Sequence, residues 1–362
     1  MPEPLLNHKS RALLALLQTL KSMQYSFVTI SPLSHLRINT RQDHPKARID
    51  DVSKPASKLQ NLRDIFGWSR SFNTAAIDQN VYGWMRQAEI IRTEKSDFFS
   101  TVRVSSYQFY SKPLMNKIGA EHLLDNREKL DSPEKVSEHN LLFLHSAFPT
   151  TNIDAVFFGP DTYRYLNFID QVLASRSKDT TSRIVDIGCG AGPGAILMAL
   201  RFPKAKVLAT DINQTALELT RVNAHFAGAS NVKVAFSDLL NDLEGQFDVI
   251  TANPPYLVDK DARVYRHGGG LLGAEFSLKM LKAAIPRLAP GGQFVLYTGA
   301  AIVDSEDVFK QEVRQYLDQD QTRELTWQYQ ELDPDIFGEE LFNDAYADTD
   351  RIAAIGLVVT MA

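Results

Sequence analysis

A short run of polar and rigid residues could hold an amino group for reaction. Asn253, Pro254, Pro255 and Tyr256 follow an apolar stretch, residues 247–252, that has the composition of a buried strand. Two consecutive prolines exclude helix and strand pairing, so a rigid turn is expected where the strand ends. There the Asn253 side-chain oxygen and the Pro254 carbonyl can accept the two N–H bonds of a planar amide or nucleobase amine, with the Tyr256 ring against its face. We predict that all four residues are catalytic, because they would orient the nitrogen lone pair for attack without a strong base.

A glycine-rich turn upstream predicts a site for a nucleotide-like cofactor. An apolar strand is expected over residues 183–187, and glycines after it let the backbone approach a ligand closely. Dinucleotide and S-adenosylmethionine (SAM) sites both use such a turn. A carboxylate just ahead of the first glycine would repel a pyrophosphate, yet it suits the ammonium group of SAM. The cofactor residues predicted here are Asp186, Gly188, Gly190 and Gly192.

Two further acidic residues follow the next two predicted strands. Asp211 comes 23 residues after Gly188, where a carboxylate can accept both ribose hydroxyls of a nucleoside. Asp238 follows a third strand and can accept the adenine amino group, with Leu239 beside the ring. Ile212 is assigned to the cofactor together with these residues, and so is Asn253. A single Asp after a strand is often a turn residue or a helix cap, but three in succession indicate a site.

The elements that position these residues alternate regularly from residue 183 onward. Strands are expected at 207–210, 232–236, 247–252 and 293–298, and helices at 215–226 and 277–288. This rhythm predicts an α/β fold, a Rossmann-like doubly wound parallel sheet with helices on both faces, closed by a last antiparallel strand near the chain end. Ligands bind beyond the carboxyl ends of the strands in such sheets, and all the motif residues fall there.

In these motifs the chain resembles the class I SAM-dependent methyltransferases that carry an NPPY signature. It is most similar to the HemK-type protein glutamine methyltransferases and their relatives with the small methyltransferase domain. The resemblance covers roughly residues 157–301 and rests on "DIGCGAGPG", "TDIN", "SDLL" and "NPPY" in that order. Upstream, "FFGPDTYRYLNFI" resembles a family segment that lies over the cofactor, from which Pro160, Thr162 and Tyr163 are carried over. The Tyr and Leu after the prolines resemble the glutamine enzymes, whereas the ribosomal RNA guanine enzymes usually have Phe and His.

The resemblance implies S-adenosyl-L-methionine as the cofactor and methyl transfer to a planar amino nitrogen, first of all a protein glutamine amide. One alternative is an RNA or DNA amino-methyltransferase acting on adenine or guanine, with single-stranded RNA the easier target. Another is a methyltransferase-fold scaffold without turnover, although a scaffold would not need the intact motif and acids. The expected partner is a translation-factor-like protein or RNA.

The N-terminal part of the chain differs from the rest in charge and pattern. Residues 1–150 carry 20 Lys and Arg against 15 Asp and Glu, and the remainder is net acidic. We expect a mixed α/β substrate-recognition domain over 1–150, similar to a winged helix, and the methyltransferase domain over 151–362. Helices are expected at 9–24 and 77–91, and strands at 98–110 and 141–147. An irregular basic stretch could meet RNA phosphates, although a solvated face is the commoner reading; it holds Arg37, Arg41, Lys46, Arg48, Lys54, Lys58 and Arg63.

Composition agrees with an enzyme of the cytoplasm. The chain has 362 residues, 44% of them apolar and 23% charged, which suits two domains with proper cores. Cys189 is the only cysteine, so no intramolecular disulfide can form, and its place in the glycine turn favours a small filler over a nucleophile. No apolar run approaches membrane-spanning length. Histidines are scattered, so no metal site is predicted. His267, at the start of "HGGG", is a candidate general base in a loop that could close over substrate.

Overall fold

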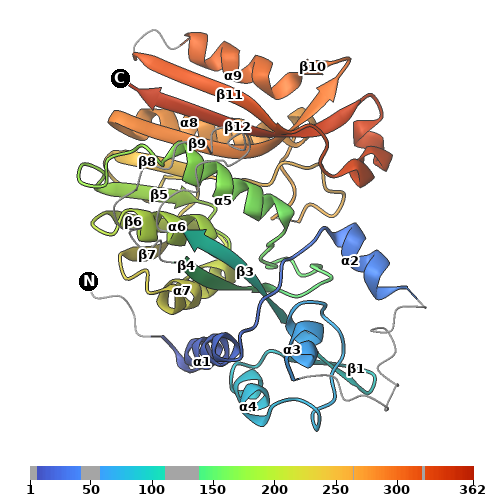
Figure 1. The fold of residues 1–362 in the computed structure, drawn as a ribbon. Helices are drawn as coiled ribbons and strands as arrows, with labels where there is room; N and C mark the ends of the chain where they lie inside the picture. Colours follow the sequence, from blue (N-terminus) through green and yellow to red (C-terminus); the bar gives the residue numbers. More distant parts are fainter. Residues whose placement is uncertain (1–5, 42–57, 111–137, 264, 320–322) are drawn as a thin grey trace, which may run out of the picture.

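A single large sheet sets where the motif residues meet (Figure 1). The computed structural model describes residues 6–41, 58–110, 138–263, 265–319 and 323–362. Within them the sheet runs in the order β11-β12-β9-β8-β5-β6-β7, with β10 paired to β9. Neighbours from β9 to β7 are parallel, and β12 is antiparallel to both β9 and β11. The strands are β5 (Arg183–Ile187), β6 (Lys206–Asp211), β7 (Val232–Phe236), β8 (Phe247–Ala252), β9 (Leu288–Val303), β10 (Glu306–Asp307), β11 (Leu325–Asp333) and β12 (Arg351–Met361).

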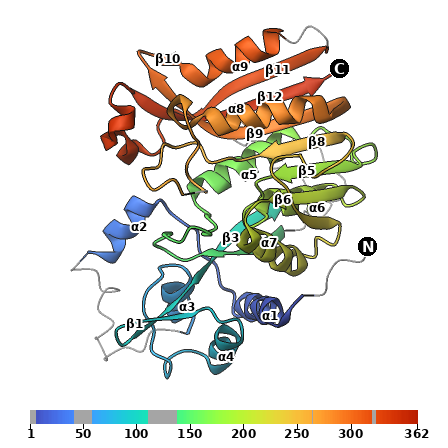
Figure 2. The same cartoon turned by 180° about the vertical axis from the view of Figure 1, so that it is seen from behind.

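Helices cover both faces of this sheet. The helices are α5 (Pro160–Val172), α6 (Pro193–Arg201), α7 (Gln214–Ala227), α8 (Glu275–Ala284) and α9 (Val308–Gln319). Alternate strand residues point to opposite faces, so Val249 joins the apolar cluster of α5, α6 and α7, while Ile250 joins that of α8 and α9. Helices α5 and α6 lie in front of the sheet in Figure 1, and α8 lies in front in the reverse view of Figure 2. The doubly wound α/β fold is therefore confirmed.

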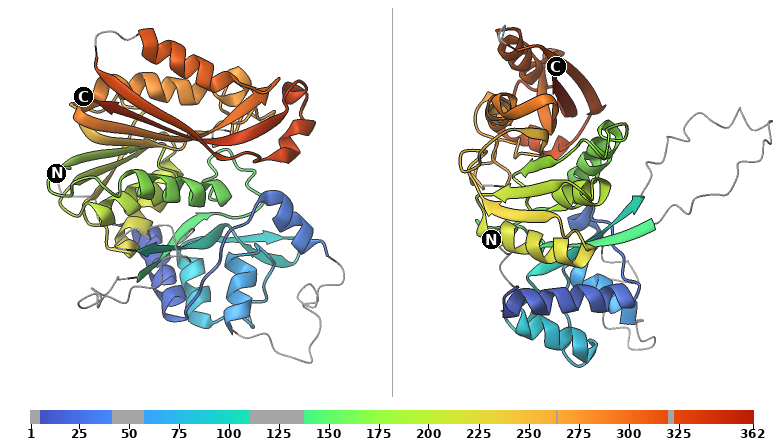
Figure 3. Two further views of the ribbon diagram at one scale, coloured as in Figure 1. Left: turned by 45° about the horizontal axis from the view of Figure 1, so that its top comes forward. Right: turned by 90° about the vertical axis from the view of Figure 1, so that its left-hand side faces the viewer.

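The N-terminal elements lie beside α7, at the β7 end of the sheet (Figure 3). They are α1 (His8–Ser22), α2 (Pro32–Asn39), α3 (Lys58–Phe66), α4 (Gln79–Gln87), the hairpin β1 (Ile91–Glu94) and β2 (Asp97–Ser100), and the ribbon β3 (Val102–Tyr110) and β4 (Glu138–Ser146). Their apolar core includes Leu16 and Leu17 of α1 and continues into Leu219 and Val222 of α7. The predicted boundary near residue 150 falls in the connection between β4 and α5, and the division into two domains stays a prediction.

Most expected elements occur close to their predicted limits. Strands β5, β7 and β8 match theirs residue for residue, and the antiparallel strand near the chain end is β12. The expected strand 98–110 is two strands, and the expected helix 277–288 ends at Ala284, because Pro286 cannot continue it and a 3₁₀ turn follows.

The expectation of irregular structure around the basic stretch is wrong for two segments. Arg37 lies on α2, which begins with Ser31 as its cap and Pro32 in its first turn. Arg63 lies on α3, and its Nε donates to the Ser26 carbonyl. Lys46, Arg48 and Lys54 lie outside the described residues. In the part of the chain that the structure describes, no helix has the length and apolar character needed to cross a bilayer.

Candidate functional site

The carboxyl ends of β5, β6, β7 and β8 open on one cavity of about 390 Å³. It gathers most of the predicted site residues, although they come from separate parts of the chain. The predicted residues in its lining are Thr162, Asp186, Gly188, Gly190, Asp211, Ile212, Asp238, Leu239, Asn253, Pro254, Pro255 and Tyr256. Gly192 and Pro160 are outside this lining, so a direct cofactor contact by either stays a prediction.

The glycine turn forms part of the cavity wall, with residues 188–191 in the lining. Gly188 and Gly190 have φ values of +67° and +56°, and the Gly190 N–H donates a 3.0 Å hydrogen bond to the Asp211 carboxylate. Gly192 serves packing instead, because a Cβ there would lie 2.7 Å from Thr220 Cγ2. Cys189 also lines the cavity, and burial raises the pKa of its thiol well above the usual value, as expected for a filler.

Asp186 is a buried carboxylate at the cavity wall. Its Oδ1 accepts hydrogen bonds from the hydroxyls of Tyr165 at 2.6 Å and Thr251 at 2.8 Å, and its Oδ2 accepts from the Ala195 N–H at 2.9 Å. Burial raises the pKa of Asp186 to about 6, against the opposing effect of these hydrogen bonds. Among the described residues it has no cationic partner. A ligand ammonium group would supply the missing positive charge, so this wall fits the amino-acid part of SAM.

Asp211 and Asp238 also line the cavity. Asp211 accepts from the backbone N–H groups of Gly190 and Asn213, and burial raises its pKa. Each of its oxygens retains a lone pair for a ribose hydroxyl. Asp238 is exposed at the rim, and the apolar side chains of Ile212 and Leu239 line the space between them. These groups fit a nucleoside with an apolar ring face and hydrogen-bond donors.

Asn253 is half-buried at the end of β8, and its side-chain amide makes no hydrogen bond to a described residue. Tyr256 is buried, and its ring packs over Gly299, where a Cβ would lie 2.4 Å from the ring. Its ring centroid is 6.3 Å from that of Tyr297 and 6.1 Å from that of Phe337. The motif thus presents a free amide beside an aromatic wall.

The sequence reasoning missed a buried acid next to this wall. Asp161 lines the cavity, and its Oδ1 accepts a 2.8 Å hydrogen bond from the Tyr297 hydroxyl. Burial raises the pKa of Asp161. Burial, and to a smaller extent the negative charge of Asp161, raises the pKa of the Tyr256 hydroxyl. The only available signal was its place between Pro160 and Thr162. Tyr163 does not line the cavity; its hydroxyl accepts from the Thr29 N–H and ties α5 to the N-terminal region.

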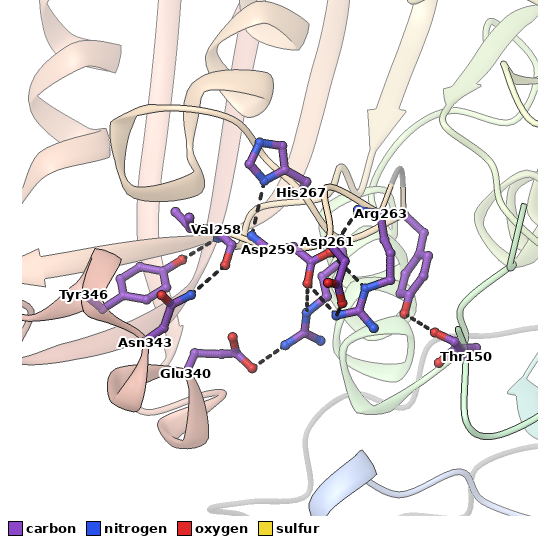
Figure 4. Close-up of polar contacts among 11 residues, drawn as sticks. Thr150, Val258, Asp259, Asp261, Arg263, His267, Glu340, Asn343 and Tyr346 are labelled. Atoms are coloured by element: carbon purple, nitrogen blue, oxygen red, sulfur yellow. Dashed lines mark hydrogen bonds and ion pairs between the residues drawn. The ribbon is translucent and has the colours of Figure 1, made fainter. Parts of the chain in front are cut away.

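The loop after the motif, residues 257–270 without the undescribed residue 264, contributes Leu257, Ala262, Tyr265, Arg266 and His267 to the cavity lining. Figure 4 shows its polar contacts. Asp259 accepts hydrogen bonds from the Arg263 backbone and side chain, and its N–H donates to His267 Nδ1 at 3.2 Å. A neutral His267 then carries its proton on Nε2, which leaves no lone pair for a general base. Gly268 approaches the Tyr256 backbone so closely that a Cβ would lie 2.7 Å from its Cα.

A segment near the chain end, residues 334–350, holds this loop in place. It joins β11 to β12, and its Glu340, Asn343 and Tyr346 side chains contact the loop (Figure 4). A fourth side chain, Phe337, packs against Tyr256 of the motif. Glu340 pairs with Arg266, Asn343 donates to the Val258 carbonyl at 3.1 Å, and the Tyr346 hydroxyl accepts from the Val258 N–H at 2.9 Å. Phe337 reaches the cavity itself and has φ of +53°. Residues 334–350 therefore shape the site.

Comparison with known proteins agrees with this geometry. Residues 166–324 match the family model of the methyltransferase small domain. A release factor glutamine methyltransferase of Koribacter versatilis is 32% identical over 151 residues, covering 38% of this chain and 54% of the relative. A ribosomal RNA small subunit methyltransferase C of Cronobacter sakazakii is 28% identical over 131 residues, covering 36% and 35%. The chain thus spans about half or less of the length of these relatives.

Among solved structures, a methyltransferase from Pyrococcus furiosus resembles the chain with a TM-score of 0.38 and 22% identity, over 57% of this chain and 88% of the other. The family match begins within α5 and includes the glycine turn, Asp211, Asp238 and the Asn-Pro-Pro-Tyr run. Residues 166–324 are therefore similar to the methyltransferase small domain.

Proposed function

We propose that the chain is a SAM-dependent N-methyltransferase that methylates the side-chain amide of a protein glutamine. One observation carries this proposal: the unpaired amide of Asn253 lines the same cavity as Asp186, the glycine turn, Asp211 and Asp238. A side chain that can bind an amino nitrogen therefore lines the same cavity as residues that suit a cationic nucleoside.

Residues of the chain can orient the amide that receives the methyl group. Weak bases can then remove the proton from its nitrogen. When bound, SAM supplies an electrophilic methyl carbon. Asn253 Oδ1 and the Pro254 carbonyl accept the two N–H bonds of the acceptor amide, which localises the lone pair on its nitrogen. A nitrogen that has gained a fourth bond is acidic, so either oxygen or water can take its proton. No strong base is needed, which agrees with the engaged Nδ1 of His267.

A protein acceptor is favoured by the relatives and by the loop that covers the motif. The relatives with identity above 30% over this region are named release factor glutamine methyltransferases. The loop 257–270 and the segment 334–350 close one side of the cavity, which suits a side chain inserted from a protein loop. Release factors and ribosomal RNA both take part in translation. This supports a protein that acts in the cytoplasm on a translation-factor-like partner.

An RNA amino group is the second candidate acceptor. The same Asn253 chemistry applies to adenine or guanine, and residues 1–150 have an excess of basic over acidic residues. The similarity to a ribosomal RNA enzyme at 28% identity points the same way. A base would have to leave its stack to reach Asn253.

A transfer assay separates these acceptors. Methyl-tritiated SAM is incubated with the protein and a lysate of cells that lack it, and the products are split between protease and nuclease. Label that survives nuclease but not protease is expected, followed by mass spectrometry of a methylated glutamine. Label that survives protease but not nuclease would replace glutamine by a nucleobase. SAM binding without any transfer would leave only the scaffold reading.

A further inference from the structure

A second, much smaller cavity of about 10 Å³ lies where the N-terminal region meets the connection from β4 to α5. Its polar lining comes from Thr29, Arg103, His145, Ser146 and Thr150, and the rest is apolar or aromatic. None of the described residues in this lining is acidic.

Arg103 is the unusual member of this lining. It lies on β3 opposite His145 of β4 and is only 5% exposed. Its Nε and Nη2 atoms are buried and have no hydrogen-bond partner, and among the described residues no ion pair includes it. Its guanidinium lies 5.6 Å from the ring centroid of Phe27, and burial lowers its pKa to about 10. A buried, unpaired cation costs folding free energy, so such a group calls for an anion.

The unpaired atoms specify the shape of that anion. The N–H groups of Nε and Nη2 lie in the guanidinium plane along one edge, and they form the fork that binds two oxygens of one planar group side by side. His145 cannot compete for the anion as a cation, because burial lowers its pKa well below the usual value. Its Nε2 is 2.7 Å from the Ser105 hydroxyl, so it is already engaged.

The size of the cavity selects a carboxylate over a phosphate. A volume of about 10 Å³ corresponds to about one water-sized group. A carboxylate is larger than one water, so its two oxygens reach the fork only if the walls move apart, and a tetrahedral phosphate with its two ester linkages requires a wider opening still.

The small cavity adjoins the methyl-transfer cavity through one aromatic residue. Phe157 lines both cavities. Its ring stacks on Tyr265 of the loop 257–270, with centroids 5.9 Å apart, and the Tyr265 hydroxyl donates to the carbonyl of Thr150, which lines the small cavity. A carboxylate at Arg103 would therefore lie across Phe157 from the acceptor amide.

We propose that Arg103 receives an acidic side chain of the protein acceptor and so fixes which glutamine reaches Asn253. This inference rests on the proposed function for its protein acceptor, but the anion site itself can be tested without it. Arg103 acts in positioning and specificity, because it does not touch the reacting atoms.

The anion site is tested by thermal unfolding in sodium formate against sodium chloride and sodium phosphate at matched ionic strength. Formate is expected to raise the unfolding temperature of the wild type saturably and beyond chloride. The effect is expected to vanish in Arg103→Met and to persist in Arg11→Met, which removes an exposed charge of the same region. Without formate, Arg103→Met is expected to unfold at or above the wild-type temperature, because it removes a buried unpaired charge.

Absence of a formate effect in the wild type, or an equal effect in Arg103→Met, would overturn the proposal. A larger effect of phosphate than of formate would also overturn it and would point to an RNA backbone. If Arg103→Met does not fold, Arg103→Lys, which keeps the charge but loses the fork, is expected to weaken the formate effect.

Steady-state kinetics with the methylated protein then test the link to the acceptor. In Arg103→Met the KM for the protein is expected to rise about tenfold or more, with kcat and SAM affinity close to wild type. An unchanged KM with active wild type would reject the role of Arg103 and leave the proposed function intact. A wild type that methylates no protein would reject the proposed function, while the formate result would still decide the anion site.

Discussion

The Tyr346 hydroxyl accepts a 2.9 Å hydrogen bond from the backbone N–H of Val258, two residues after the Asn-Pro-Pro-Tyr run. The same hydroxyl lies 3.3 Å from the Leu272 carbonyl and donates to it. Tyr346 is 1% exposed, so one buried phenol joins the start of the loop 257–270 to Leu272, two residues beyond its end. The segment between the last two strands therefore determines the position of a loop far earlier in the sequence.

Tyr346→Phe is expected to loosen this loop without emptying the space. The ring stays in place, but the Val258 N–H loses its acceptor, which costs roughly 1–3 kcal/mol of unfolding free energy when the group stays buried. The KM for the acceptor should rise several-fold, while SAM affinity should not change. Denaturant unfolding and steady-state kinetics measure both effects, and an unaltered KM would show that the loop holds its position without this bond.

Phe337→Ala is expected to damage acceptor use, because the side chain is the one contribution of residues 334–350 to the cavity lining. We expect kcat/KM for the acceptor to fall about tenfold, since aromatic packing against Tyr256 and Arg266 is lost. Phe342→Ala is the matched control in the same segment, because Phe342 is 90% exposed. Equal losses in the two variants would assign the effect to the segment as a whole.

Asn253→Ala removes the amide that is proposed to hold the acceptor nitrogen. Turnover is expected to fall by about two orders of magnitude or more, because orientation of the lone pair is lost, with SAM affinity within a few fold. Isothermal titration with SAM and a single-turnover assay separate the two quantities. Asn80→Ala, an exposed asparagine of α4, is the control. Near wild-type turnover in Asn253→Ala would remove this residue from the active site.

SAM affinity is expected to depend on pH through Asp186. Burial raises its pKa from 3.8 to about 6, and an adjacent ammonium favours the ionised form, so binding below pH 6 must release a proton. The association constant should therefore fall as pH drops below 6, by up to about tenfold per unit, and level off above it. Calorimetry in buffers of different ionisation enthalpy counts the proton. Asp186→Asn should flatten the profile, and a wild-type profile already flat from pH 5 to 8 would separate Asp186 from the ammonium.

The stability of the ligand-free protein should show the opposite trend through the same group. Between pH 3.8 and about 6 the folded state binds more protons at Asp186 than the unfolded state does. Its contribution to the free energy of unfolding therefore decreases as pH rises through this range, by roughly 3 kcal/mol for a shift of this size. Chemical denaturation of wild type against Asp186→Asn at pH 4.5 and 7.5 isolates this part from the other carboxyl groups.

The parallel sheet, and the edge of it where the motif residues lie, could be predicted because both follow from short stretches of sequence. Apolar runs such as residues 247–252 define strands by composition, and the residue after each strand must lie at the same edge in a parallel sheet. Asp186, Asp211, Asp238 and Asn253 could thus be brought together without coordinates, and the structure places all four in one cavity. The expected helices 77–91 and 277–288 instead end at Gln87 and Ala284, because propensity does not say where packing stops a helix.

The contacts that surround this edge depend on side chains that no periodicity connects. Asp161 meets Tyr297 across 136 residues, and Tyr346 meets Val258 across 88. The buried Arg103 lines a cavity with Phe157 and has no ion-pair partner among the described residues. By itself the sequence determined the parallel sheet, the family resemblance and the residues that meet at the strand ends, since these follow from short-range pattern. Only the tertiary structure decided which loop closes the cavity and which buried charge remains free, because burial and pairing are set by groups distant in the chain.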